Sequence, residues 1–204
     1  MSKYQIGIID YDSGNHNSIR QTVLDLGYKC FVGRESEKLS PCDLLILPGV
    51  GAFPHARKAL GHYGMDSFLK EHVSHGKPLI GICLGLQLLA QTSEENGNTV
   101  GLGFFDGNIV PIPSNFHIGW NHLKATEQAN RFRQYGEGID FYFNHSFHYD
   151  GPDEDILFST VSARHSITAA IRKDLIVGFQ FHPEKSQEAG RLLLKAAIEE
   201  LIHG

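Results

Sequence analysis

Short apolar runs alternate with helix-compatible segments through the first half of the chain, and this alternation constrains the fold more than any other feature. The runs are apolar throughout, which is typical of strands covered on both faces of a parallel sheet. The expected strands are Tyr4–Asp10, Lys29–Val32, Asp43–Leu47 and Pro78–Ile82. The expected helices are Ser18–Leu26, Ala56–Leu60, Asp66–His75 and Leu84–Gln91. The first half is therefore predicted to be a doubly wound α/β fold, a mostly parallel sheet flanked by helices.

The pattern changes after Gly97, where short strand-like segments are separated by Gly, Pro and Asn residues. Such punctuation favours an antiparallel arrangement. The expected strands of this half are Gly101–Pro111, Ile139–Phe143, Ile156–Ser159, Thr168–Arg172 and Leu175–Phe181. A helical period returns at Gln187–His203. Because the 204 residues contain no linker-like segment, we expect a single domain over residues 1–204.

Composition and charge exclude several classes of protein. Hydrophobic residues make up 41% and charged residues 20% of the sequence, as in ordinary globular proteins. No apolar run approaches the roughly 18 residues of a membrane span, and the first residues lack the long apolar stretch of a signal peptide. The net charge is −5, without a Lys/Arg cluster that could contact nucleic acid. We therefore expect a cytoplasmic protein with neither a membrane nor a nucleic acid as partner.

The sequence predicts no disulfide framework, no metal site and no cofactor. The three cysteines, Cys30, Cys42 and Cys83, are an odd number without CxxC spacing. The twelve histidines include no HExxH pair. His145 and His148 share one segment, where two polar histidines in a loop or at a strand end are favoured over a metal site.

The segment Lys77–Gln87 places Cys83 at the end of an apolar strand and directly before a helix. A glycine stands two residues away on each side, so the backbone can turn tightly, as in a nucleophile elbow. A free thiol with a pKa of about 8.5 is mostly protonated at neutral pH, whereas the unpaired N–H groups of a helix N-terminus favour the thiolate. Cys83 is therefore a candidate nucleophile. The alternative is a buried structural cysteine in a glycine-rich turn.

The segment Val177–Ser186 ends a second apolar strand in His182, followed by Pro183 and Glu184. A thiolate mechanism needs a base that takes the proton and later returns it to the departing amine. That base needs a third group to fix its tautomer. His182 can be the base and Glu184 the orienting acid, with Pro183 restricting the backbone between them. A lone histidine at a strand end is common, but its pairing with a candidate nucleophile favours catalysis.

These two segments resemble the signature motifs of the class I (triad-type) glutamine amidotransferases. The resemblance is carried by Gly81-Ile82-Cys83-Leu84-Gly85-Leu86-Gln87 and Phe181-His182-Pro183-Glu184. It implies a flavodoxin-like α/β core. It also implies hydrolysis of the side-chain amide of glutamine through a thioester on Cys83, with His182 and Glu184 completing a catalytic triad.

The tetrahedral intermediate of such a reaction needs hydrogen-bond donors for its developing oxyanion. The backbone N–H of Leu84, directly after the nucleophile, is one candidate. The other is expected in the loop Leu47-Pro48-Gly49-Val50-Gly51-Ala52-Phe53. This loop is similar to the oxyanion loop of the glutaminase subunit of imidazole glycerol phosphate synthase. There, the peptide before the residue matching Val50 must turn its N–H toward the site, and Gly49 makes such a turn cheap.

The resemblance to that subunit spans essentially the whole chain. It implies that glutamine contacts Gly51, Gln87, Glu95, His145, Ser146 and Phe147. It also implies that Asn15, Trp120 and Lys185 face a cyclase subunit, which would form a heterodimer with this chain and receive ammonia for histidine biosynthesis. Two of these residues have alternatives. Glu95 could pair with the ammonium group of glutamine or be an exposed carboxylate, and Asn15 could stabilise its own turn.

Three short segments depart from the usual pattern of that subunit. GNLRS is replaced by Gly14-Asn15-His16-Asn17-Ser18, PHxGWN by Phe116-His117-Ile118-Gly119-Trp120-Asn121, and HSYY by His145-Ser146-Phe147-His148. None touches the triad, but all lie toward the expected partner face. The first alternative is therefore a paralogue that supplies ammonia for sugar amidation in surface-polysaccharide biosynthesis. A stand-alone cysteine hydrolase is disfavoured by the LPGVGAF loop, and a binding module with a structural cysteine by the His-Pro-Glu match.

Overall fold

The computed structural model describes residues 3–203, and within them the main sheet has eight strands in the order β2-β1-β3-β4-β14-β13-β12-β9. The strands from β2 to β14 run parallel and span Lys29–Gly33 (β2), Gln5–Ile9 (β1), Leu44–Leu47 (β3), Leu79–Ile82 (β4) and Ile176–Phe179 (β14). The antiparallel strands span His165–Lys173 (β13), Ile156–Ser162 (β12) and Lys124–Ala125 (β9). The predicted α/β class, a mostly parallel sheet with added antiparallel strands, is confirmed.

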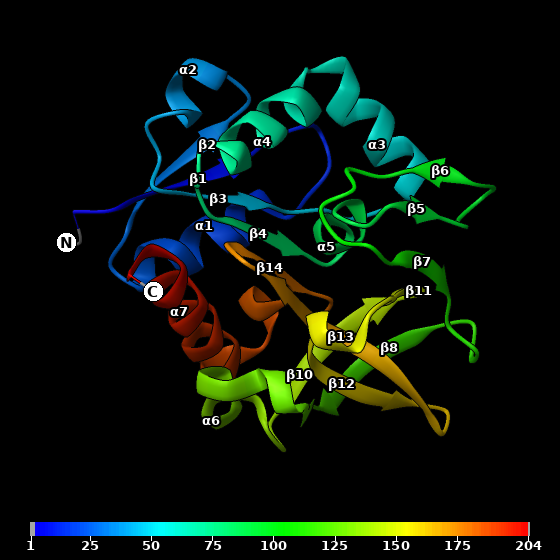
Figure 1. The fold of residues 1–204 in the computed structure, drawn as a ribbon. Coiled ribbons are helices and arrows are strands. Elements are labelled where there is room, and N and C mark those ends of the chain that lie inside the picture. Colours follow the sequence, from blue (N-terminus) through cyan, green and yellow to red (C-terminus); the bar gives the residue numbers. More distant parts are fainter. Residues whose placement is uncertain (1–2, 204) are drawn as a thin grey trace.

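Helices cover both faces of this sheet (Figure 1). On one face α1 (His16–Asp25) and α7 (Gln187–His203) pack on one cluster of buried apolar side chains. On the other face α2 (Ser36–Leu39), α3 (Phe53–His62) and α4 (Met65–Ser74) pack on a second cluster. The inner strands are buried along their whole length. This double cover is the reason for the continuous apolar runs in the sequence.

The carboxyl ends of three central strands meet at one edge of the sheet. Leu47 of β3 lies opposite Gly81 of β4, and Ile82 of β4 lies opposite Phe179 of β14. The segments that follow these strands are therefore brought together: the loop after β3, the start of α5 (Leu84–Leu88) after β4, and the segment after β14. Open α/β sheets form their ligand sites at this edge.

The second half of the chain adds a meander and two smaller sheets. The strands β12, β13 and β14 form the predicted antiparallel meander. One small sheet pairs β8 (His117–His122) with β10 (Asp140–His145), and the other joins β11 (Phe147–Asp150), β7 (Asn108–Pro111), β5 (Thr92–Ser93) and β6 (Thr99–Val100). The remaining helical segments are α6 (Arg133–Gly136) and the 3₁₀ helices Glu127–Phe132, Asp153–Asp155 and Pro183–Lys185.

The predicted strand Gly101–Pro111 is wrong over most of its length, because only Asn108–Pro111 is a strand. The backbone N–H groups of residues 101–105 instead donate to carbonyl groups of residues 88–91. They thereby satisfy the carbonyls beyond the end of α5, which would otherwise lack partners. For the same reason α5 ends at Leu88, earlier than the predicted Gln91. The other predicted strands and helices are present, with ends shifted by a few residues.

The strands β5, β6, β8, β9 and β11 and the helices α2 and α6 were not predicted. In β8 the side chains of Ile118 and Trp120 are exposed, whereas His117 on the opposite face is buried. Its alternation is therefore the reverse of an ordinary half-buried strand, in which apolar residues face inward. The two helices are single turns, too short for a periodic pattern.

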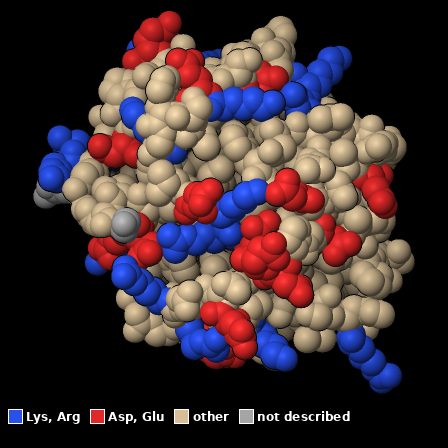
Figure 2. Space-filling model, viewed as in Figure 1, with Lys and Arg blue, Asp and Glu red and all other residues tan. Residues whose placement is uncertain are grey.

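Within residues 3–203 no helix is both long and apolar enough to cross a membrane. On the face shown in Figure 2, Lys and Arg side chains are interspersed with Asp and Glu. Ion pairs among the described residues include that of Lys173 with Asp106 at 2.6 Å. The surface charge is thus mixed in sign on this face.

Candidate active site

Cys83 stands at the tight turn between β4 and α5, with φ 55° and ψ −113°. A positive φ is strained for a residue with a side chain, and such strain is typical of a nucleophile elbow. The two neighbouring glycines are required by close packing. A Cβ on Gly85 would lie 1.9 Å from the carbonyl oxygen of Leu47, and a Cβ on Gly81 would lie 2.8 Å from the nitrogen of Leu86. The backbone N–H of Cys83 donates to Phe179 at 2.7 Å and so ties the turn to β14.

His182 and Glu184 follow β14 and face this turn. Nδ1 of His182 lies 2.9 Å from Oε1 of Glu184, and the two side chains are only 3% and 1% exposed. Since a carboxylate only accepts, Nδ1 carries the proton, and Nε2 remains for the side-chain hydrogen bond with Cys83. Burial alone would lower the pKa of His182, but the hydrogen bonds and charges of Cys83 and Glu184 raise it to about 9.

The backbone of His182 is fixed by neighbouring elements. Its N–H donates to the carbonyl of Tyr142 on β10 at 2.9 Å. The hydroxyl of Ser186 donates to the carbonyl of His182 at 2.7 Å and accepts from the N–H of Tyr142 at 2.9 Å. These bonds fix the backbone that carries the imidazole between β14 and the small sheet, as a positioned base requires.

Asn15 lies against the triad. Its side-chain amide donates to Oε1 of Glu184 at 3.4 Å. Although Asn15 precedes α1, it makes no side-chain capping bond, so the alternative role of stabilising its own turn is not seen. Its assignment to a partner interface stays a prediction. Its contact within the chain is with the carboxylate that orients His182.

The loop after β3 packs directly on the elbow. A Cβ on Gly49 would lie 2.8 Å from Cβ of Leu84 and 2.9 Å from the nitrogen of Gly85, so only glycine fits. The hydroxyl of Tyr11 donates to the carbonyl of Pro48 at 2.6 Å. These contacts hold the loop beside Cys83, where Val50 and Leu84, the residues expected to supply the oxyanion donors, line the same cavity. The direction of their N–H groups toward an oxyanion stays a prediction.

A cavity of about 260 Å³ opens at Cys83. Its walls include the predicted substrate-binding residues together with Lys185 and Asn144. The lining residues are Val50, Gly51, Cys83, Leu84, Gln87, Glu95, Asn144, His145, Ser146, Phe147, His182 and Lys185. The fold therefore brings together residues from five separate stretches of the sequence. Their roles toward glutamine stay predictions.

Two polar side chains of the cavity have defined free atoms. Both N–H groups of the Gln87 amide are used, because Nε2 donates to the carbonyl of Phe147 at 3.0 Å and to Oε1 of Gln180 at 3.2 Å. Only Oε1 of Gln87 remains to meet a ligand. Oε2 of Glu95 accepts the N–H of Phe53, the first residue of α3, at 2.7 Å. The exposed-carboxylate alternative for Glu95 is thus disfavoured, since the side chain is anchored at the cavity wall.

Trp120 and Lys185, both predicted to face a partner, both lie close to the ring of Tyr142. The rings of Trp120 and Tyr142 meet edge to face with centroids 6.0 Å apart. Nζ of Lys185 lies 5.8 Å from the ring centroid of Tyr142. The ring of Tyr142 in turn lies 6.4 Å from that of His182. Both side chains are exposed, and Lys185 also borders the cavity that contains Cys83 and His182.

Gln180 and Asn144 are site residues that the sequence prediction missed. Nε2 of the fully buried Gln180 approaches Sγ of Cys83 at 3.9 Å. A polar residue two positions before His182, inside an apolar run, was the available signal, because side chains at i and i+2 share a face of an extended strand. Asn144 precedes His145 at the end of β10 and has no comparable signal. Among residues 3–203, no group of His, Cys, Asp and Glu side chains could hold a metal ion.

The arrangement of a cysteine and a histidine–carboxylate pair beyond the ends of parallel strands is that of a cysteine-dependent amide-cleaving enzyme. The chain belongs to the class I glutamine amidotransferase family, whose model, "Glutamine amidotransferase class-I", matches residues 7–199. It is accordingly a glutamine amidotransferase with glutaminase activity, and the recognition made from the two motifs is confirmed.

Curated relatives cover almost the same length. "Imidazole glycerol phosphate synthase subunit HisH" of Lactococcus lactis subsp. lactis is 38% identical over 200 residues, which are 97% of this chain and 99% of that protein. The protein of the same name from Caldanaerobacter subterraneus subsp. tengcongensis is 40% identical over 193 residues, covering 93% and 95%. A chain of the Thermotoga maritima PurLQS structure matches with a TM-score of 0.77 at 18% identity, covering 98% of this chain and 100% of that one. This likeness confirms the flavodoxin-like fold.

Proposed function

We propose that this protein is the glutaminase subunit of an imidazole glycerol phosphate synthase. It hydrolyses glutamine to glutamate and ammonia, and passes the ammonia to a cyclase subunit in histidine biosynthesis. The observation that carries this proposal is the similarity to subunits of that name at 38% and 40% identity along nearly the full length of both chains.

In the first half-reaction Cys83 is the nucleophile. With a pKa of about 9, His182 is largely protonated at neutral pH and can hold the thiolate of Cys83 as an ion pair. Sγ attacks the side-chain amide carbon of glutamine. His182 then gives its Nε2 proton to the departing nitrogen, the C–N bond breaks and ammonia leaves. Glu184 holds Nδ1 and stabilises the imidazolium while it exists.

In the second half-reaction neutral His182 takes a proton from water, and the resulting hydroxide attacks the thioester carbon. The C–S bond breaks, glutamate leaves, and the thiolate and imidazolium are restored. One glutamine and one water thus give one glutamate and one ammonia. Both tetrahedral intermediates place negative charge on the former carbonyl oxygen, for which the N–H groups of Val50 and Leu84 are the proposed donors.

The cavity walls support recognition of an amino acid. Oε1 of Gln87 can only accept, so it would meet an N–H donor of glutamine. The Glu95 carboxylate, held by Oε2, leaves Oε1 for the ammonium group, as a charge-assisted hydrogen bond. Gly51, His145, Ser146 and Phe147 complete the proposed contacts around the substrate.

The proposed partner face lies just beyond the triad. Trp120 and Lys185 are exposed and both lie close to the ring of Tyr142. Aromatic side chains such as Trp120 and Tyr142 are enriched at interfaces, and Lys185 adds an exposed positive charge that an acidic partner residue could meet. A heterodimer formed there would place the cyclase next to the site of ammonia release. We propose a cytoplasmic enzyme, in keeping with the biosynthetic role.

A direct test is to measure glutamate release from glutamine by the purified chain, alone and with a cyclase subunit. We expect slow release by the chain alone and strong activation by the cyclase. Activation only by a sugar-amidating synthetase would instead assign the chain to surface-polysaccharide biosynthesis. Full activity without any partner would identify a stand-alone hydrolase, and no glutamate under any condition would contradict the proposal.

A further inference from the structure

Two buried histidines bond to each other beside the catalytic cavity. Nδ1 of His117 on β8 lies 3.0 Å from Nε2 of His145 on β10, and the two residues are register partners in the small sheet. They are 8% and 7% exposed. His145 lines the cavity, whereas His117 does not reach it. Neither ring belongs to the triad, so the pair has no role in the mechanism described so far.

The neighbours of this pair fix the position of every proton. Nδ1 of His145 lies 2.8 Å from the carbonyl of Phe147. Because a carbonyl only accepts, this nitrogen carries the proton and Nε2 of neutral His145 is an acceptor. Nδ1 of His117 must therefore donate to it, which leaves Nε2 of His117 as an acceptor for Nδ2 of Asn121 at 3.3 Å.

The amide of Asn121 is itself oriented at both ends. Nδ2 donates to the carbonyl of Val161 on β12 at 2.6 Å, and Oδ1 accepts the N–H of His122 at 3.0 Å. Its donor side therefore faces His117. The result is a directional chain of hydrogen bonds, Asn121→His117→His145→Phe147, in which each neutral histidine ring donates only toward the next residue.

Burial keeps both histidine rings neutral, as this chain of hydrogen bonds requires. It lowers the pKa of His117 and lowers that of His145 to about 3, against which the bond to the Phe147 carbonyl acts only partly. The titratable groups whose charges act on His145 are His117, His148 and His182, and all three lower its pKa. At neutral pH each ring therefore has one donor and one acceptor nitrogen.

The network of hydrogen bonds continues to the nucleophile. The Phe147 carbonyl also accepts from Nε2 of Gln87, whose second N–H goes to Oε1 of Gln180. Nε2 of Gln180 then points to Sγ of Cys83 at 3.9 Å. The donor groups next to the sulfur and the carbonyl at the cavity wall are thus held by the same connected set of side chains.

We infer that His117 and Asn121 are positioning residues for glutamine hydrolysis: they hold His145 in one tautomer and, through the Phe147 carbonyl, set the amides of Gln87 and Gln180 around Cys83. This inference rests on the proposed function for its kinetic consequence, but its structural core does not depend on it. A buried network that is satisfied throughout fixes a single geometry, whereas one missing donor leaves unpaired groups that must rearrange.

The outer face of β8 is exposed and apolar, so this strand could transmit a contact made outside the protein to the buried histidine pair. Ile118 and Trp120 alternate with His117 and Asn121 along β8 and are 62% and 49% exposed. A ligand or subunit that shifts β8 from outside therefore moves His117 and Asn121 on the inside. The strand connects an exposed apolar surface to the donors that surround the sulfur.

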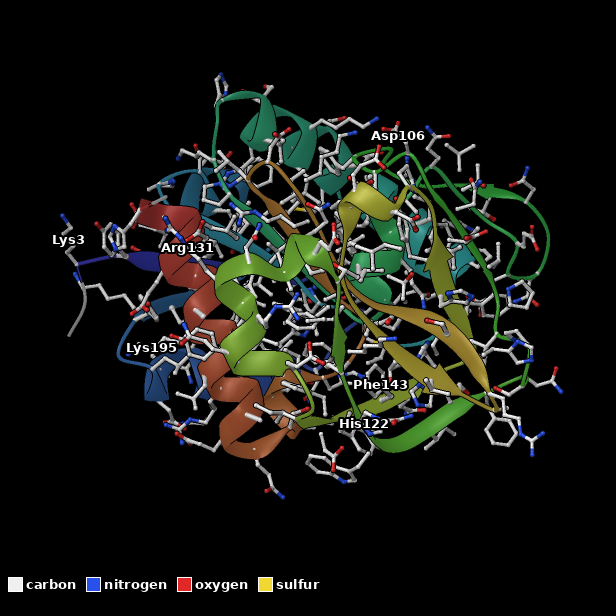
Figure 3. The ribbon with its side chains drawn as sticks, turned by 60° about the horizontal axis from the view of Figure 1, so that its bottom comes forward. Lys3, Asp106, His122, Arg131, Phe143 and Lys195 are labelled. Carbon is white, nitrogen blue, oxygen red and sulfur yellow. The ribbon has the colours of Figure 1, made fainter. Side chains whose placement is uncertain are left out.

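The tautomers can be measured without any activity assay. Long-range ¹H–¹⁵N NMR of the full chain, labelled at its histidines, is expected to show His117 and His145 both protonated at Nδ1 at pH 7. In His117→Phe, which keeps a ring beside Phe143 (labelled in Figure 3) but removes both nitrogens, Cys83 should react with iodoacetamide at least about threefold more slowly. Protonation of His117 at Nε2, or an unchanged alkylation rate, overturns the inference.

Kinetics separate positioning from mere folding. His117→Phe should lose at least about tenfold in kcat/KM for glutamine, whereas His117→Asn, whose amide can still donate to His145, should stay within about threefold of wild type. Asn121→Ala is the second variant and should lose about threefold or more with little change in Tm. His122→Phe, the same replacement at the exposed neighbour labelled in Figure 3, is the matched control and should be unaffected.

An equal loss in His117→Phe and His117→Asn would show that only ring packing matters. Wild-type kcat/KM in both His117→Phe and Asn121→Ala would show that this chain of hydrogen bonds has no role in glutamine hydrolysis. Either outcome overturns the inference. If the wild-type protein itself releases no glutamate, the proposed function fails. The tautomer and alkylation measurements still decide the inference.

Discussion

The hydroxyl of Ser13 donates a hydrogen bond of 2.6 Å to the carbonyl of Val50. The loop after β1 therefore holds the Val50–Gly51 peptide group, which directly follows the Gly49–Val50 peptide group whose N–H is the expected oxyanion donor. In Ser13→Ala this carbonyl loses its partner and the loop gains freedom. We expect kcat for glutamine to fall about fivefold, the equivalent of about 1 kcal/mol, with little change in KM. Steady-state kinetics check this, and a loss confined to KM would contradict it.

Cys83→Ala should abolish glutamine hydrolysis while leaving the fold and partner binding intact, because it removes the nucleophile but only a small side chain. Ammonia-driven synthesis by the complex should survive. A glutamine-mimicking electrophile should label Cys83 in preference to Cys30 and Cys42, whose pKa values burial raises to about 11. Mass spectrometry locates the adduct. An alanine variant that still releases glutamate at nearly the wild-type rate would exclude Cys83 as nucleophile.

The contacts of His182 with Cys83 and Glu184 predict a pH-dependent stability. The pKa of His182 is raised in the folded protein from 6.5 to about 9. A raised pKa means that folding favours the protonated ring, so this contribution is full below about pH 6.5 and is lost as the pH rises toward about 9. Glu184→Gln removes part of it. Denaturant unfolding at several pH values should show a wild-type advantage on the order of 1 kcal/mol at pH 6 that shrinks by pH 9. A difference independent of pH would argue against the contact of His182 with Glu184 as its cause.

His182→Ala should reduce turnover more than Glu184→Ala, because the base transfers protons in both half-reactions whereas the carboxylate only orients it. Both losses should appear mainly in kcat. An undiminished rate in His182→Ala would require another base. His145 is then the first candidate by position, although its lowered pKa makes it a poor one.

Two Gly→Ala changes, one at the closely packed elbow and one in a helix, should change the free energy of unfolding in opposite directions. In Gly85→Ala the new Cβ would meet the Leu47 carbonyl at 1.9 Å, so we expect the free energy of unfolding to fall by at least about 3 kcal/mol. In Gly61→Ala, inside α3, the nearest atom is 3.5 Å away. Alanine favours the helix, and stability should rise by up to about 1 kcal/mol. Thermal unfolding of both variants tests the contrast.

The parallel half of the fold could be predicted because strands covered by helices on both faces have continuous apolar sequences. The strand β8 could not, because its outward side chains are apolar and its inward ones polar. Residues 101–105 also misled the prediction. They have strand-like composition, but their N–H groups serve the carbonyls beyond α5. That use depends on tertiary contacts that no local pattern encodes.

The candidate site divides in the same way. The triad and the loop beside it lie in contiguous sequence motifs directly after predicted strands, so their positions could be expected from the sequence. The side chains that support them come from distant elements. Gln180 reaches Cys83 and Asn15 reaches Glu184 only through the packing of β14 and α1 at the sheet edge. The pairing of His117 with His145 depends on the register of β8, which was itself not predicted.

Lys185 provides the test of partner coupling. It lies directly after Glu184, lines the cavity and places Nζ 5.8 Å from the ring of Tyr142. If an acidic residue of the cyclase meets this exposed cation, contact and catalysis are joined within three residues of His182. Lys185→Glu should therefore weaken association by at least about tenfold and lower the activation factor, the ratio of glutamate release with cyclase to glutamate release by the same variant alone.

The matched control reverses a charge elsewhere on the surface. Lys195, labelled in Figure 3, lies on α7, where it forms an exposed pair with Glu199 at 3.7 Å. Such a pair contributes under about 1 kcal/mol, so Lys195→Glu should leave association and activation near wild type. Calorimetry gives the affinity, and glutamate release with and without cyclase gives the activation. Equal effects of the two reversals would indicate a general dependence on net charge. Weakened binding with full activation at saturating cyclase would mean that Lys185 serves docking alone, and that the signal to the oxyanion loop enters through another contact, for which the Trp120 face of β8 is the next surface to test.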